Sequence, residues 1–210
     1  MQAARSQVPG GDRHRYFIIN KPRNMVSQFV SSHDVGLLGD LDYDFPEGIH
    51  AIGRLDNHSE GLLILTTNKK VTKLLFESKT PHKRTYLVKV NKVVTTETLN
   101  ELRNGVTIRI KGGEHYNTTP CDAEIVAEPQ DLFQDNDPAA LYGTYSWLLI
   151  SLTEGKFHQV RKMVRALRHP CRRLIRISIE DLCLGDLQPG AVKELEEEDF
   201  FRLLKIDNYN

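Results

Sequence analysis

Short β-type runs that do not alternate regularly with helices constrain the fold of this chain most strongly. These runs are rich in apolar, β-branched and aromatic residues, and they predict strands at 15–20, 62–66, 85–90, 106–110, 122–127 and 145–152. Helices are predicted after Asn68, ending before Pro81, and around Leu99 and Leu102, ending at Gly105. Gly112-Gly113 is a predicted hairpin turn. Since regular strand–helix alternation is missing, the pattern predicts an α+β fold.

Length and composition limit the classes of protein to consider. With 210 residues and 40% apolar content, the chain suits one domain or two closely packed halves. No apolar stretch reaches the roughly 18 residues of a membrane helix, and the N-terminus lacks a signal-peptide core. The three cysteines are far apart, which favours reduced thiols. We expect a cytoplasmic protein with a disordered tail over 1–14 and a polar loop over 128–143. Residues 193–210 are expected to form an acidic extension that is a solvated tail or a helix end.

Charge is distributed unevenly along the chain although the formal net charge is zero. Between Lys156 and Ile179 there are eight basic residues and no acidic ones, whereas Glu194 to Asp199 is almost wholly acidic. A basic segment of this kind neutralises phosphates and gives salt-dependent affinity for nucleic acid. The alternative is a solvated face that binds nothing.

The basic segment begins as a predicted helix after Gly155. Its apolar face is formed at helical spacing by Val160, Met163, Val164 and Leu167. At about 100° per residue, three arginines share one flank and Lys162 lies on the opposite side. We expect the first of these arginines to point into a cleft and the other two to meet phosphates; they are Arg161, Arg165 and Arg168.

Asp56 is the first candidate for a reactive side chain. It lies in a polar turn between Gly53 and Gly61, just before an apolar run, and the flanking glycines permit unusual backbone angles. The alternative is an aspartate that merely accepts hydrogen bonds from nearby backbone N–H groups. Dinucleotide-binding, P-loop, metalloprotease and serine-elbow motifs are missing from the sequence.

Four motifs then follow one another in a specific order. They are Asn20-Lys21-Pro22, Gly53-Arg54-Leu55-Asp56-x-x-Ser59-Glu60-Gly61-Leu62-Leu63, Lys83-Arg84-Thr85-Tyr86-Leu87-Val88 and Glu154-Gly155-Lys156-x-His158-Gln159-Val160-Arg161-Lys162-Met163. In this order and spacing they resemble the RsuA-type pseudouridine synthases, a family that includes RsuA, RluB, RluE and RluF. The resemblance covers residues 15–192, the expected catalytic domain, and Leu174-Ile175-Arg176 extends it. Glu180-Asp181 departs from the family pattern.

The resemblance implies a fold and a set of site residues. The fold is a long, mixed, mainly antiparallel sheet in two halves, with flanking helices and a catalytic cleft across its face. Asp56 would be the catalytic carboxylate, Tyr86 the ring that stacks on uracil, and Arg161 the cation beside Asp56. The residues expected to contact RNA are Lys21, Arg54, Lys156, His158, Gln159, Lys162, Arg165, Arg168 and Arg176. Neither a metal nor an organic cofactor is implied.

The substrate expectation also rests on the resemblance. Many members carry an S4 RNA-binding module before the catalytic domain, but here the first catalytic strand is expected near residue 15, leaving no room for one. This feature is most similar to the RluE branch, which modifies large-subunit (23S) ribosomal RNA. We therefore expect a monomeric pseudouridine synthase that acts on this RNA. The alternatives are a transfer-RNA-directed synthase and a catalytically silent RNA-binding or ribosome-assembly protein.

Overall fold

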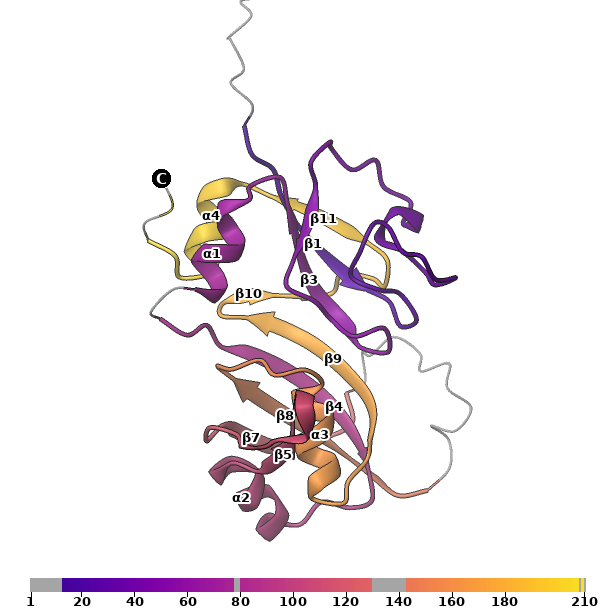
Figure 1. Ribbon diagram of the computed structural model, residues 1–210, viewed down its shortest axis with the longest axis vertical. Coiled ribbons are helices and arrows are strands. Elements are labelled where there is room, and N and C mark those ends of the chain that lie inside the picture. The colour runs from indigo at the N-terminus through magenta and orange to yellow at the C-terminus, as the bar shows by residue number, and fades with distance from the viewer. Residues whose placement is uncertain (1–12, 78–79, 130–142, 208, 210) are drawn as a thin grey trace, which may run out of the picture.

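One large mixed sheet organises the protein. The computed structural model describes residues 13–77, 80–129, 143–207 and 209. In these residues the sheet has the strand order β11-β1-β3-β9-β4-β8-β7, with β2 beside β3 and β10 beside β9 (Figure 1). Its strands are β1 (Tyr16–Lys21), β2 (His50–Ile52), β3 (Glu60–Thr66), β4 (Arg84–Asn91), β7 (Asp122–Val126), β8 (Tyr145–Leu152), β9 (Cys171–Ile179), β10 (Leu182–Cys183) and β11 (Val192–Leu195).

The remaining elements flank this sheet. A separate hairpin pairs β5 with β6, and a short 3₁₀ turn at Lys111–Gly113 joins them, which confirms the predicted Gly112-Gly113 turn. Another 3₁₀ turn covers Leu38–Asp40. The hairpin strands are β5 (Thr107–Arg109) and β6 (His115–Asn117), and the helices are α1 (Lys70–Phe76), α2 (Thr96–Asn104), α3 (Gln159–Ala166) and α4 (Glu197–Leu203).

The sheet divides into two halves that meet at one short junction. Strands β3 and β9 run parallel and pair only through Glu60 with Ile175 and Gly61 with Arg176, whereas the other pairings are antiparallel. Gly61 has φ +98°, and a Cβ atom there would lie 2.3 Å from the carbonyl oxygen of Arg176. Only glycine therefore permits this close approach of the two strands.

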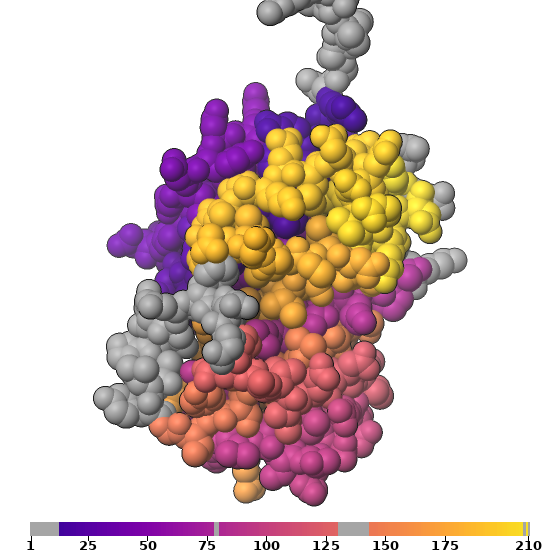
Figure 2. All heavy atoms as spheres, turned by 180° about the vertical axis from the view of Figure 1, so that it is seen from behind, coloured from indigo at the N-terminus to yellow at the C-terminus, as the bar shows by residue number. Residues whose placement is uncertain are grey.

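Both ends of the chain build the same half of the molecule. Viewed from behind, the indigo and yellow segments form the upper part and the middle of the chain forms the lower part (Figure 2). Strand β11 pairs with β1, and Phe200 and Phe201 of α4 are fully buried against Tyr16, whose ring centroid lies 4.6 Å from that of Phe200. The prediction of a solvated tail or helix end over 193–210 is therefore corrected in part: residues 192–203 form β11 and α4, whose acidic side chains are mostly exposed, but Phe200, Phe201, Leu204 and Ile206 belong to the core.

The other half packs α2 and α3 against β4 and β8. Its core joins apolar side chains of these strands with Leu99 and Leu102 of α2 and Val160 and Met163 of α3. The Thr95 hydroxyl accepts a hydrogen bond from the Thr98 backbone at 3.3 Å and caps α2. The helix ends at Gly105, as predicted.

Most of the predicted elements are confirmed. The six predicted strand regions correspond to β1, β3, β4, β5, β7 and β8, and Asn68 Oδ1 accepts a hydrogen bond from the backbone of Lys70 at 3.0 Å, at the start of α1. The disordered tail expected over 1–14 falls mostly on residues 1–12, and the polar loop mostly on 130–142; both stretches lie outside the described residues. In the described part of the chain, no helix is long and apolar enough to cross a membrane.

Candidate active site

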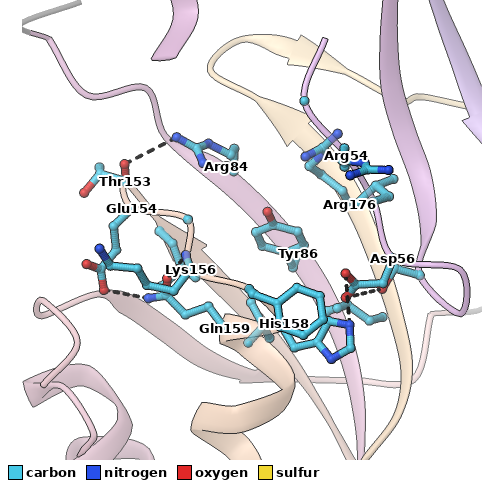
Figure 3. A pocket seen from close by; sticks show the side chains of 18 of the residues that line it. Arg54, Asp56, Arg84, Tyr86, Thr153, Glu154, Lys156, His158, Gln159 and Arg176 are labelled. Atoms are coloured by element: carbon cyan, nitrogen blue, oxygen red, sulfur yellow. Dashed lines mark hydrogen bonds and ion pairs between the residues drawn. The ribbon is translucent and has the colours of Figure 1, made fainter. Parts of the chain in front are cut away.

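A cleft of about 630 Å³ opens where the two halves of the sheet meet. The Asp56 turn forms one wall, the segment from Leu152 to Val160 forms another, and side chains of β4 and β9 lie between them (Figure 3). Among the lining residues are Arg54, Asp56, Arg84, Tyr86, Glu154, Lys156, Phe157, His158, Gln159 and Arg176. The cleft therefore collects Asp56 and Tyr86 with several of the residues predicted to contact RNA.

The Asp56 turn is fixed by its backbone. Gly53 has φ +69° and Gly61 has φ +98°, so both flanking glycines adopt angles that other residues avoid. The Asp56 carbonyl accepts a hydrogen bond from the backbone of Ser59 at 2.9 Å and closes the turn. The Ser27 hydroxyl bonds both the N–H and the C=O of Leu55, at 2.9 and 3.0 Å. A residue held in this way is presented to the cleft in one orientation.

Lys21 supports this turn from beneath and does not face RNA. Its side chain is fully buried, and its ammonium donates to the carbonyl oxygens of Pro22 at 2.8 Å, Met25 at 2.6 Å and Asn57 at 3.5 Å. Burial lowers the pKa of Lys21 to about 8. The structure therefore corrects the prediction of an RNA contact. The hydrogen bonds of the buried Lys21 ammonium link the end of β1 to the residue that follows Asp56.

The Asp56 carboxylate faces side chains only. His158 Nε2 lies 3.3 Å from Asp56 Oδ1, Arg161 Nε lies 3.9 Å from Oδ2, and the Ser59 hydroxyl lies 3.5 Å from Oδ2. In the described residues no backbone N–H donates to this carboxylate, so the alternative of a turn-capping aspartate does not apply. Its side chain is 29% exposed, which leaves it open to a ligand in the cleft.

Arg161 contacts the backbone of the Asp56 turn more closely than it contacts the Asp56 carboxylate. Its Nη2 donates to the His58 carbonyl at 2.8 Å and lies 3.2 Å from the Ser59 hydroxyl. Arg161 is on α3, in the opposite half of the sheet from the turn. The expectation that it points into the cleft is wrong, because it lies beside Asp56 but lines the neighbouring hollow and not the cleft itself. Its guanidinium thus ties the two halves together beside Asp56.

Tyr86 lies near the centre of the cleft in Figure 3. It is on β4, opposite Arg176 of β9, and the pairing shifts register between Thr85 and Tyr86. Its ring packs at the edges of two apolar clusters and is half-buried. A flat aromatic side chain in this position offers a stacking surface for a base.

The segment before α3 shows which predicted RNA contacts are structural. Gln159 is only 4% exposed, and its amide donates to Glu154 at 2.6 Å and accepts from the backbone of Lys156 at 2.8 Å. The predicted RNA contact of Gln159 is therefore corrected to a structural role. Lys156 lines the cleft with its ammonium 4.6 Å from the centre of the Tyr116 ring. His158 begins α3 with φ +54° and contacts Asp56, which the sequence did not indicate.

Basic side chains of α3 continue beyond the cleft. A second hollow of about 560 Å³ is lined by Arg161, Lys162 and Arg165 together, so the expectation that Lys162 lies on the opposite side is wrong. Arg168 is exposed but follows the end of α3 with φ +65°, and so does not continue the helical flank. On β9, Arg173 is buried and pairs with Glu60, so only part of the basic segment forms a basic surface.

Two residues that line the cleft, Arg84 and Phe157, were not predicted from the sequence to belong to the site. Arg84 precedes Tyr86 by two positions on β4, and this strand spacing was the available signal. Phe157 occupies the unassigned position of the last motif, is 68% exposed, and stacks on His158 with ring centroids 3.8 Å apart. An exposed aromatic ring at the mouth of a basic cleft is suited to contact a base.

A carboxylate, an aromatic ring and basic side chains in one cleft suit an enzyme that acts on a nucleotide of a nucleic acid. Comparison with known proteins specifies the class: the family model for RNA pseudouridylate synthase matches residues 15–166. The chain therefore belongs to the RNA pseudouridylate synthase family, and its activity is that of an RNA pseudouridine synthase.

Curated relatives cover most of the chain. A ribosomal large subunit pseudouridine synthase E from Vibrio parahaemolyticus is 35% identical over 87% of this chain and 74% of its own length. A protein of the same name from Xanthomonas axonopodis is 31% identical over 82% of this chain and 89% of its own length. A crystal structure of a pseudouridylate synthase matches with a TM-score of 0.73 and 26% identity, over 91% of this chain and 74% of that chain. The expected pseudouridine synthase fold is thus confirmed.

Proposed function

We propose that this enzyme converts a uridine of large-subunit ribosomal RNA to pseudouridine and that Asp56 is its catalytic carboxylate. The observation that carries the proposal is the Asp56 carboxylate, which is held in the open cleft by a rigid turn with His158 at 3.3 Å. The substrate is supported by the names of relatives from Vibrio and Xanthomonas, which are ribosomal large subunit pseudouridine synthases.

The reaction explains why one carboxylate suffices. The bond between C1′ and N1 breaks, the uracil rotates, C5 bonds to C1′, C5 loses its proton and N1 gains one, so the atoms balance without added water. Glycoside hydrolysis instead needs a second carboxylate to activate water. Asp56 acts on the ribose either as a nucleophile at C1′ or as a base on the sugar. Tyr86 stacks on the detached uracil and limits its tumbling, and its hydroxyl is available for proton transfer.

Access to Asp56 requires the uridine to leave its RNA stack. Extrusion costs a few kcal/mol, and stacking on aromatic rings with basic contacts to phosphates offsets it. Tyr86 supplies such a ring within the cleft, and Phe157 supplies one at its mouth. The basic residues proposed to contact RNA are Arg54, Lys156, Lys162, Arg165, Arg168 and Arg176. The enzyme acts as a monomer in the cytoplasm, where ribosomal RNA is its substrate.

Release of tritium tests this proposal directly. A large-subunit ribosomal RNA transcript labelled with tritium at C5 of uridine loses the label when C5 bonds to C1′. We expect the wild-type protein to release tritium and Asp56→Asn to release none while it keeps its affinity for RNA. Release from a transfer-RNA transcript but not from the ribosomal one would refute the substrate. Binding without release by the wild type would indicate a silent RNA-binding protein.

A further inference from the structure

Two buried arginines on β9 differ in how their charge is compensated. Arg173 and Arg176 are each 4% exposed. Arg173 pairs with Glu60, with Nε–Oε1 at 3.0 Å and Nη2–Oε2 at 2.8 Å. Arg176 has no carboxylate within 4.0 Å in the described residues; its Nε donates to the Leu62 carbonyl at 2.8 Å, and its buried Nη2 has no acceptor. A buried cation without a counter-charge is costly, so its retention requires a reason.

Arg84 adds a second cation to the same cleft, and it forms no ion pair within the described residues, although its guanidinium carbon lies 5.5 Å from the centre of the Phe76 ring. It begins β4, next to β9, and its buried Nε has no acceptor in the part of the chain described. Its one hydrogen bond, from Nη2 to the Thr153 carbonyl, is long at 3.4 Å. Burial lowers the pKa of Arg84 and the positive charge of Arg176 lowers it further, whereas Tyr86 and Glu180 act in the opposite direction. The two guanidinium groups therefore repel each other across the cleft wall.

The carboxylates of the cleft do not compensate these arginines. Asp56 faces His158, and Glu154 accepts hydrogen bonds from three neutral donors, which are Tyr116 Oη at 2.5 Å, Thr119 N at 3.0 Å and Gln159 Nε2 at 2.6 Å. Arg54 is exposed at the rim and forms no ion pair within the described residues. Figure 3 shows Arg54 beside Arg176, with Tyr86 between this pair and Arg84.

We propose that Arg84 and Arg176, with Arg54 at the rim, bind the RNA phosphodiester next to the uridine that stacks on Tyr86. The proposal rests on the proposed function and names the ligand of this wall. A phosphodiester carries a full negative charge and accepts several N–H groups of guanidinium, which matches two arginines that lack an anion. The carbonyl oxygens of uracil are neutral and leave the repulsion between the arginines in place.

Inorganic phosphate tests the site without RNA. We compare the wild type, the double variant Arg84→Met with Arg176→Met, and the control Arg103→Met. Arg103 is exposed, donates to the Ala123 carbonyl at 2.7 Å and to Asn100 Oδ1 at 3.2 Å, and is not among the residues that line the cleft. At equal ionic strength, replacing chloride by phosphate raises the unfolding midpoint of all three proteins through exclusion of phosphate from their surfaces, and binding at the site should add roughly 2 °C in the wild type and the control. The double variant should lack this added rise, and a rise equal to that of the control would overturn the proposal.

RNA binding supplies the second measurement. The three proteins, each also carrying Asp56→Asn to prevent turnover, are titrated with a large-subunit ribosomal RNA transcript at several salt concentrations. The magnitude of the slope of log K against log salt should fall by about 0.7 to 0.9 in the double variant, which corresponds to the loss of one phosphate contact. The slope of the control should equal that of the wild type. An unchanged slope would contradict the phosphate site even if the wild type releases tritium. Absence of tritium release would contradict the proposed function even if phosphate stabilises the cleft.

Discussion

Replacing Gly61 by alanine tests the idea that the junction between β3 and β9 builds the active site. The added Cβ would lie 2.3 Å from the carbonyl oxygen and 2.8 Å from the nitrogen of Arg176. An alanine at φ +98° also pays roughly 1–2 kcal/mol for its backbone angle. Relief of the overlap requires the two strands to separate, and overpacking of this kind costs about 1–3 kcal/mol. We expect Gly61→Ala to lower the free energy of unfolding by about 2–5 kcal/mol.

Gly112→Ala is the matched control for this variant. Gly112 has φ +85°, but no atom lies within 4 Å of the position of its Cβ, so only the backbone cost applies. Urea denaturation of both variants separates the two contributions, and Gly61→Ala should be less stable than Gly112→Ala by about 1–3 kcal/mol. Tritium release should fall in Gly61→Ala alone, because Asp56 and Arg176 would move apart. Equal stability of the two variants would refute the reasoning.

Three further variants test the account. Phe200→Ala should lower the free energy of unfolding by about 3–5 kcal/mol in urea denaturation, because Phe200 of α4 is fully buried in the core. A change below about 0.5 kcal/mol would instead indicate that this segment is a solvated tail. The pKa of Lys21 in the folded state is about 8, below its ordinary value of 10.5. Between about pH 8 and pH 10.5 the folded state therefore binds fewer protons than the unfolded state. Wild-type stability should therefore rise by about 3 kcal/mol relative to Lys21→Met from pH 8 to 10.5, and parallel pH curves would exclude this. His158→Gln should slow single-turnover conversion with unchanged RNA affinity, whereas a loss of affinity alone would assign His158 to RNA binding.

The sequence predicted six of the eleven strands in the described residues, and the Asp56 turn, because local signals determine them. Gly53 and Gly61 adopt the positive φ angles that glycine permits, and the turn presents Asp56 to the cleft. The helix after Gly155 buries Val160 and Met163, as its apolar spacing indicated. In each case the information lies within a few residues of the feature.

The misassigned residues depend on contacts distant in sequence. Acidic residues around Glu194 suggested a solvated tail, but β11 pairs with β1 and Phe200 packs on Tyr16 from the other end of the chain. Lys21 was assigned to RNA through the family resemblance, yet the Asn57 carbonyl and two nearer ones accept its hydrogen bonds. The missing counter-charge of Arg84 is likewise a property of the packed cleft.

Mapping of pseudouridine in cellular RNA tests the central claim most directly. Large-subunit ribosomal RNA is isolated from a deletion strain complemented with the wild type or with Asp56→Asn, treated with carbodiimide and read by primer extension. The account predicts one stop that is present with the wild type and absent with Asp56→Asn. The same stop in both strains would contradict the role of Asp56, and no wild-type-dependent stop would contradict large-subunit ribosomal RNA as the substrate.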